Sequence, residues 1–230
     1  MGKRQDSRER IEAAIIEIGR RHLAVDGAAG LSLRAIAREL EMVSSAVYRY
    51  VAGRDELLTL LVVDAYTELA DAVDAADSGS DWRARVRAIA RAAREWAVGE
   101  PARWALLYGS PVPGYQAPVE RTVAPGTRVV RSLFAAVADG VAAGDIAMTN
   151  TVAAPPLSAD FDRLRAEFTF PGDDAVVARC ILSWAGIVGA ISLEVFGQYG
   201  ADTLTDPALM FDVQIDLLLG LLGAGADPQN

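Results

Sequence analysis

Between residues 31 and 58, hydroxyl, phenol and guanidinium side chains occur at spacings that would suit contacts with DNA. Arg34 and Arg49 could each make a bidentate contact with guanine, which contributes about 1–3 kcal/mol of discrimination apiece. Small hydroxyl side chains, here Ser44 and Ser45, bond to several bases and therefore discriminate weakly alone. Phosphate contacts fix register without reading sequence, and the side chains suited to them are Tyr48, Tyr50 and Arg54.

Two short helices joined by a tight turn would hold these groups in place. Ser32 is the expected N-cap of the first helix, because its hydroxyl can accept a hydrogen bond from a free backbone N–H. The apolar face of that helix consists of Leu33, Ile36, Ala37 and Leu40. Residues 41–43 would form the turn, and Ser44 would N-cap a second helix over residues 45–50. A helix-turn-helix of this kind places its second helix against base edges; the alternative is a helical hairpin that only packs.

The net charge of −9 is unfavourable for a protein that binds DNA, but the acidic residues are unevenly placed. Residues 1–60 carry 10 Lys and Arg against 9 Asp and Glu, whereas the rest carries 12 against 22. We therefore expect the acidic part to face away from DNA. A short basic arm could touch phosphates or the minor groove, or could be a disordered tail, and both readings stay open for its members Lys3, Arg4, Arg8 and Arg10.

Other kinds of chemistry find little support in the sequence. Cys180 is the one cysteine and His22 the one histidine, so an intrachain disulfide and a Cys/His metal cluster are excluded. We expect both side chains to be packing residues. A helical enzyme is disfavoured, because the chain lacks a phosphate-binding Gly loop and a nucleophile elbow. No signal-peptide core is visible, and residues 179–196 come closest to a membrane span without qualifying, so a cytoplasmic protein is expected.

The remaining elements are all predicted to be helical. A first helix should run to about Val25 and end at Asp26–Gly30. Irregular loops are expected at 109–118 and 145–156. Residues 78–81 should form a non-helical connection between two helices. Asp206 and Pro207 read as an N-cap followed by a first-turn Pro. The later helices are expected at 57–76, 82–98, 120–143, 158–168, 174–199 and 208–222.

Five arginines lie on the predicted helix 82–98, which raises the question of a second nucleic-acid contact. They are Arg83, Arg85, Arg87, Arg91 and Arg94. We prefer the interpretation of a solvated face, because apolar residues with helical spacing occupy the opposite side of the same helix.

At the helix-turn-helix residues the chain closely resembles the TetR family of bacterial transcriptional regulators. The matching motifs are Gly30-Leu31-Ser32, Arg34, Ile36-Ala37, Leu40, Val47-Tyr48-Arg49-Tyr50-Val51 and Arg54-Asp55-Glu56-Leu57. The resemblance implies an all-α homodimer with a three-helix DNA-binding domain at 1–56 and a larger ligand-binding and dimerisation domain at 57–230. It also implies that Ser32 joins the DNA-contacting residues named above. One departure is Glu41, where the family usually has Gly; a left-handed residue is expected there, at a cost of about 1 kcal/mol for Glu.

The same resemblance implies a regulatory mechanism, in which a small hydrophobic ligand releases a repressor from a pseudo-palindromic operator. The alternative is a ligand-binding helical dimer, or an activator whose DNA binding needs ligand. Each aromatic candidate for the pocket wall could equally be a core residue; the candidates are Tyr66, Trp96, Trp104, Tyr108, Phe134, Phe168 and Trp184. No cofactor is implied.

Two apolar helices near the C-terminus could pair with the same two helices of a second copy, or could be buried within one monomer. The residues expected at a dimer interface are Trp184, Gly186, Gly189, Ser192, Phe196, Phe211 and Leu218. The segment Trp184–Tyr199 resembles the WHG subtype of the family, whose signature is a Trp followed by His-Gly and then Ser-Leu-Glu-x-Phe-Gly. Val188 stands where that subtype has His.

Overall fold

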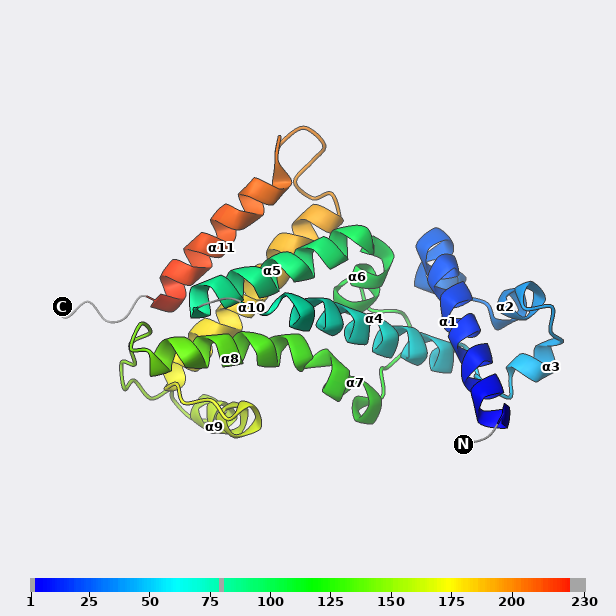
Figure 1. The fold of residues 1–230 in the computed structure, drawn as a ribbon, viewed down its shortest axis with the longest axis horizontal. Coiled ribbons are helices and arrows are strands. Elements are labelled where there is room, and N and C mark those ends of the chain that lie inside the picture. The colour runs from blue at the N-terminus through cyan, green and yellow to red at the C-terminus, as the bar shows by residue number, and fades with distance from the viewer. Residues whose placement is uncertain (1–2, 79–80, 224–230) are drawn as a thin grey trace. The chain divides into compact units, whose positions relative to one another are not determined.

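The structure, a computed structural model, describes residues 3–78 and 81–223, and its regular secondary structure over these residues is entirely helical (Figure 1). This confirms the predicted all-α class. The helices are α1 (Lys3–Gly30), α2 (Leu33–Glu39), α3 (Ser44–Val47), α4 (Arg54–Ala76), α5 (Trp82–Gly99), α6 (Pro101–Tyr108), α7 (Val119–Gly126), α8 (Arg128–Ala142), α9 (Leu157–Phe168), α10 (Asp174–Val195) and α11 (Pro207–Gly223). The predicted break at 78–81 and the end of the predicted second domain fall partly on residues 79–80 and 224–230, outside the described residues.

Side-chain oxygens cap several helices. The Asp173 carboxylate accepts a hydrogen bond from the Val176 N–H at 3.0 Å, at the start of α10. The Asp206 carboxylate accepts one from the Leu209 N–H at 2.9 Å, which confirms the predicted cap of α11. Asp81 does the same for α5. Other helices begin without a side-chain acceptor, namely α3, α6, α8 and α9.

Two predicted helices end or divide differently in the structure. α1 extends to Gly30, but Gly27 has φ 66° and ψ 179°, so the helix is interrupted where the sequence predicts its end. The single helix predicted over 120–143 is two helices, α7 and α8. Pro125 near the end of α7 cannot donate a backbone hydrogen bond, and α8 restarts after Thr127.

The chain forms two compact units. The first unit contains Met1–Glu68 and Glu100–Gly126, and the second contains Leu69–Gly99 and Thr127–Asn230. The boundary between the units falls inside α4, later than the predicted boundary at residue 57, because Leu57, Leu58 and Leu61 belong to the core of the first unit. The assignment of DNA binding to residues 1–56 and of ligand binding and dimerisation to residues 57–230 remains a prediction.

The core of the first unit joins α1, α2, α3 and the start of α4. Its fully or almost fully buried members are Ile15, Ile18, Leu23, Leu31, Leu33, Ile36, Ala37, Val47, Val51, Leu57, Leu58 and Leu61. Leu106 of α6 and Tyr115 of the following loop pack against this core. Because α2 and α3 each contribute buried side chains, the short helices are held by packing and not by their own helix propensity.

The core of the second unit lies among α5, α8, α10 and α11, and α5 runs beside both α8 and α10 (Figure 1). Cys180 is completely buried, as predicted, and burial raises the pKa of its thiol to about 12. Contrary to the prediction that no stretch qualifies as a membrane span, α10 has the length and composition of one within the described residues. Only 39% of its most apolar window is buried, so much apolar surface of α10 lies uncovered in this single chain.

The arginines of α5 are paired with carboxylates of the second unit. The pairs are Arg83–Asp145 at 3.0 Å, Arg85–Asp77 at 2.8 Å, Arg87–Asp216 at 2.9 Å, Arg91–Asp212 at 2.8 Å and Arg94–Glu194 at 2.5 Å. Their positive charge is therefore locally neutralised. This favours the preferred interpretation of the arginine face over a second contact with nucleic acid.

Candidate nucleic-acid interface

The interface begins with α2, whose N-cap is Ser32. Its hydroxyl accepts a hydrogen bond from the Ala35 N–H at 3.4 Å, which confirms the predicted cap. Leu33, Ile36 and Ala37 are buried, so the predicted apolar face of α2 is the face that packs. Arg34 is left exposed to solvent.

The turn after α2 has the left-handed residue that the resemblance to the family implies. Glu41 has φ 53°, its N–H donates to the Arg38 carbonyl at 3.1 Å, and the Met42 N–H donates to the Ala37 carbonyl at 2.9 Å. This pair of bonds is a Schellman motif, which satisfies the last carbonyls of a helix. Glu41 is exposed, so its carboxylate stays hydrated, and the backbone conformation costs about 1 kcal/mol relative to Gly.

The start of α3 differs from the prediction. Ser44 is the first residue of the helix, and the N-cap is Val43, which has extended backbone angles and no side-chain acceptor. The predicted role of Ser44 as N-cap is therefore wrong, because the turn is one residue shorter than expected. The regular helix ends at Val47, and hydrogen-bonded turns continue it, with the Tyr50 N–H donating to the Val47 carbonyl at 2.9 Å.

The packing of α3 presents most of the predicted contact residues to solvent. Ala46 and Val47 are buried and hold α3 in place. Ser45 and Arg49 are exposed, and Tyr48 is 47% exposed. Ser32, Ser44, Tyr50 and Arg54 are half-buried. The α2–turn–α3 segment, residues 32–50, thus displays hydroxyl, phenol and guanidinium groups on one small module, which we call the DNA-binding module.

Two of the predicted phosphate contacts also tie the module to its surroundings. The Arg54 guanidinium donates to the Ala28 carbonyl at 2.9 Å, linking the start of α4 to the end of α1. The Tyr50 ring lies 5.8 Å below the guanidinium carbon of Arg8. Arg8 belongs to the predicted basic arm and is part of α1, whereas the side chains of Lys3 and Arg4 lie outside the described residues.

The single histidine holds α2 against α1. His22 Nε2 lies 2.5 Å from Glu39 Oε1, and Arg21 donates to the other Glu39 oxygen at 2.8 Å. These two hydrogen bonds, that of His22 first, lower the pKa of Glu39. The side chain of His22 is 15% exposed, which agrees with the predicted partly buried packing residue.

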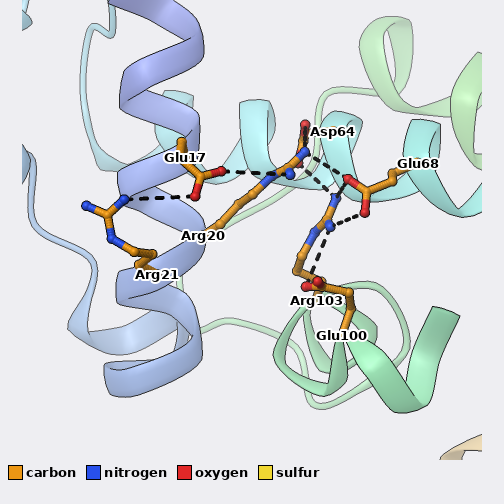
Figure 2. Close-up of polar contacts among 7 residues, drawn as sticks. All are labelled: Glu17, Arg20, Arg21, Asp64, Glu68, Glu100 and Arg103. Atoms are coloured by element: carbon orange, nitrogen blue, oxygen red, sulfur yellow. Dashed lines mark hydrogen bonds and ion pairs between the residues drawn. The ribbon is translucent and has the colours of Figure 1, made fainter.

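A network of arginines and carboxylates joins α1, α4 and α6 within the first unit (Figure 2). Arg103 has a side chain only 3% exposed, and its guanidinium lies 2.8 Å from Glu68 Oε1 and 3.0 Å from Asp64 Oδ2. Arg20 of α1 approaches the same carboxylates, at 2.5 Å from Asp64 Oδ1 and 3.0 Å from Glu68 Oε2. Glu100 lies 3.6 Å from Arg103. The sequence analysis missed this network, although Asp64 and Glu68 stand four residues apart and so share one helix face.

The aromatic residues predicted to line a ligand pocket fall into two groups. Tyr66, Trp104 and Tyr108 meet in the first unit, with ring centroids 6.3 Å apart for Tyr66–Tyr108 and 4.4 Å for Trp104–Tyr108. Burial raises the pKa of both tyrosines. Phe134 and Phe168 meet in the second unit at 4.8 Å.

The last two aromatic candidates also belong to the second unit. Trp96 lines a surface cavity of about 360 Å³ together with alanines of α4 and α5, and Trp184 is half-buried on α10. Which of these groups meets a ligand stays a prediction.

The residues predicted at a dimer interface divide between core and surface. Phe211 is 2% exposed and therefore belongs to the core of the second unit. A Cβ atom on Gly186 would lie 3.0 Å from Leu218, so these two residues are in contact within one chain. Gly189 and Phe196 are exposed, and Trp184 and Ser192 are half-buried. The sequence analysis missed the large exposed apolar residues of α10 and α11, which are Ile181, Leu182, Leu193, Leu209, Met210, Val213 and Leu217.

Comparison with known proteins agrees with this geometry. Residues 86–218 match the family described as tetracyclin repressor-like, C-terminal domain. The HTH-type transcriptional regulator Rv1816 of Mycobacterium tuberculosis is 65% identical over 225 residues, which cover 96% of each chain. The crystal structure of SCO4313 is 34% identical, with a TM-score of 0.76, and the match covers 95% of this chain and 100% of that one.

A more distant relative matches a shorter segment. The HTH-type transcriptional repressor DrrR1 of Streptomyces coeruleorubidus is 35% identical over 83 residues, which cover 36% of this chain and 28% of that protein. The family match extends over more than half of the chain, and the match to the mycobacterial regulator extends over nearly all of it. This chain therefore belongs to the TetR family and is a helix-turn-helix transcriptional regulator, not an enzyme.

Proposed function

We propose that this regulator is a cytoplasmic repressor, which binds a pseudo-palindromic operator as a homodimer and leaves it when a small hydrophobic ligand binds. The observation that carries the proposal is the DNA-binding module, in which buried Ala46 and Val47 leave Ser45, Tyr48 and Arg49 exposed together. Exposed groups of these types match the donors and acceptors of base edges and phosphates. The description of DrrR1 as a repressor supports the direction of regulation.

The apolar surface of α10 and α11 supports the dimer. Leu182 is 54% exposed on α10, and Val213 and Leu217 of α11 are 49% and 70% exposed. Val213, Leu217 and Gly220 follow helical spacing, so they form one stripe on α11. Exposed apolar residues gathered on one helix face in this way often mark an interaction surface. Pairing α10 and α11 with their copies would bury it in a four-helix bundle and create the two-fold symmetry that a pseudo-palindrome requires.

The ligand would act by changing the populations of two dimer conformations. It need only favour a spacing of the two DNA-binding modules that differs from one turn of DNA, about 34–36 Å. The aromatic groups around Tyr108 and Phe134 supply apolar walls for such a ligand. We also place the segment Trp184–Tyr199 in the WHG subtype, on the strength of its Trp and its Ser-Leu-Glu-x-Phe-Gly run.

Binding of the purified protein to the DNA upstream of its own gene tests the proposal. We expect a dimer on size-exclusion chromatography and sequence-specific binding that weakens as salt is raised from about 50 to 200 mM, since phosphate contacts release counterions. Arg49→Ala should weaken specific binding by at least tenfold, because a bidentate base contact contributes about 1–3 kcal/mol at each half-site.

Arg163→Ala is the matched control for Arg49→Ala. Arg163 has a side chain 73% exposed on α9, away from the DNA-binding module in the sequence, and its substitution should leave DNA binding unchanged. Equal losses for both variants would indicate a general charge effect. A protein that binds DNA only after a ligand is added would instead be an activator of the ligand-requiring kind, and the proposed repressor mechanism would fail.

A further inference from the structure

The surface cavity beside Trp96 combines apolar walls with one charged group. It lies between the last turns of α4 and the helix α5, within the second unit, and has a volume of about 360 Å³. Small-molecule sites have volumes of about 300–1,000 Å³. The lining of this cavity consists of Ala72, Ala75, Ala76, Ala92, Glu95 and Trp96.

Alanines on the two helices leave the space open, because their side chains are too short to fill it. Ala72, Ala75 and Ala76 are three and four residues apart and therefore share one face of α4. Ala92 and Trp96 share a face of α5 in the same way. Ala75 is exposed and the other three alanines are half-buried, so solvent reaches these walls and a ligand with apolar groups would cover them.

Packing and an ion pair hold the cavity in shape. Trp96 is 9% exposed and is the one buried residue of the lining, so its indole is fixed in the second unit. The Arg85 guanidinium donates to both oxygens of Asp77 at 2.8 Å, which ties α5 to the residue that follows α4. A ligand would therefore enter a site that is already formed, at a small cost in ordering.

Glu95 gives the cavity its charge. This residue is exposed, and among the described residues no cation forms an ion pair with its carboxylate. The neighbouring arginines of α5 are engaged elsewhere, since Arg91 pairs with Asp212 at 2.8 Å and Arg94 pairs with Glu194 at 2.5 Å. The lining contains no arginine or lysine, so the charge of the cavity wall is negative.

We propose that this cavity binds a small organic cation, an ammonium group that carries alkyl substituents. The substituents cover the alanines, and the positive charge lies against the Glu95 carboxylate and the indole of Trp96, the ring that attracts cations most strongly. This assignment rests on the proposed function, because it gives a chemical class to the ligand that releases the operator. The cavity lies at one end of α4, and Leu57 and Leu58 at the other end belong to the core of the first unit.

Two small molecules of the same shape test the site without any DNA. Choline and 3,3-dimethyl-1-butanol differ in that a positively charged nitrogen in the first replaces a neutral carbon in the second. Isothermal titration calorimetry of the full-length protein measures the affinity for each. We expect choline to bind about tenfold more tightly, from the combined attraction of the indole ring and the carboxylate.

Substitutions in the lining provide the second arm. Glu95→Gln keeps the size of the side chain but removes its charge, so it should weaken choline binding about threefold and leave the neutral compound unaffected. Ala76→Leu fills the cavity with a residue that also favours a helix, and it should abolish binding of both compounds. Glu167→Gln is the control, because Glu167 is an exposed carboxylate of the same unit outside the lining.

The effect on DNA binding completes the test. Choline should weaken binding of the wild-type protein to an operator selected from random DNA, and it should have no effect on Ala76→Leu. Equal affinities for the two compounds, a preference that survives in Glu95→Gln, or choline binding that leaves operator affinity unchanged would each overturn the inference, while the proposed function would stand with another class of ligand. If the wild-type protein selects no operator, the proposed function fails, whereas calorimetry still confirms or overturns the cation site.

Discussion

Arginine–carboxylate pairs occur in both units of the molecule, but they differ in burial. In the first unit, Arg103 has a side chain 3% exposed and binds Asp64 and Glu68, whose oxygens also face an arginine of α1. In the second unit, Arg91 of α5 and Asp212 of α11 pair at the surface, with side chains 54% and 36% exposed. Arginine–carboxylate pairs in the two units therefore differ in how far they are removed from water.

The difference shows which ion pairs determine structure. A buried charge that loses its partner cannot regain its hydration, so removing one member of such a pair is strongly destabilising. In an exposed pair both charged groups stay largely hydrated whether or not they are paired, so the pair contributes about 0–1 kcal/mol to stability. We conclude that the Arg103 network fixes how α1 and α6 attach to α4, whereas each surface pair on α5 contributes little alone.

Removing the buried guanidinium should have the largest effect. Arg103→Met is expected to lower the free energy of unfolding by about 2–4 kcal/mol, somewhat less than for a fully buried pair because Arg20 still faces Asp64 and Glu68. Urea unfolding at one fixed protein concentration measures this. Arg103→Lys, which keeps the charge but not the planar fork, should fall between Met and wild type. A loss below about 0.5 kcal/mol for Arg103→Met would mean that burial does not distinguish the two units.

An intermediate effect is expected where burial is intermediate. Arg94 and Glu194 both have side chains 16% exposed and form two hydrogen bonds between α5 and α10. Arg94→Ala should cost about 1–3 kcal/mol, the usual range for hydrogen bonds to charged groups. The measurement is the same urea titration, with exposed Arg163→Ala as the control. If Arg94→Ala cost no more than the control, the difference in stability between the Arg103 network and the α5 pairs would follow the unit in which they lie and not their burial.

The smallest effect is expected at Asp212 and should depend on pH. The hydrogen bonds from Arg91 are the main cause of the lowered pKa of this carboxyl group. A carboxyl with a lowered pKa stabilises the fold above its unfolded pKa of about 3.9, and this contribution is lost as the pH falls through the folded pKa. Asp212→Asn should therefore cost less than about 1 kcal/mol at pH 7, and this cost should decrease as the pH falls through the folded pKa. Thermal melts of the wild type and Asp212→Asn across this pH range measure the effect. A stability difference that did not shrink toward low pH would contradict the view that Arg91 lowers the pKa of Asp212.

Local features of the DNA-binding module could be predicted because they depend on a few neighbouring residues. The Ser32 cap follows from residue type and position before an apolar helical repeat, whereas the left-handed conformation of Glu41 was expected from the resemblance to a family that usually has Gly there. The start of α3 could not be predicted equally well, since Ser44 and Val43 differ by one position and only the packing of Ala46 and Val47 selects between them.

The amino-acid sequence alone determined the helical class, the position of the helix-turn-helix and the caps of α2 and α11, because these depend on contacts within a few residues. Only the tertiary structure decided which apolar residues of α10 and α11 are buried and which are left exposed, as Phe211 and Leu217 show. It alone also brought Arg20 and Arg103 to the same two carboxylates, 83 positions apart in the chain. Helical periodicity identifies a face, but the partner of that face, and therefore its burial and electrostatics, is chosen by segments distant in the sequence.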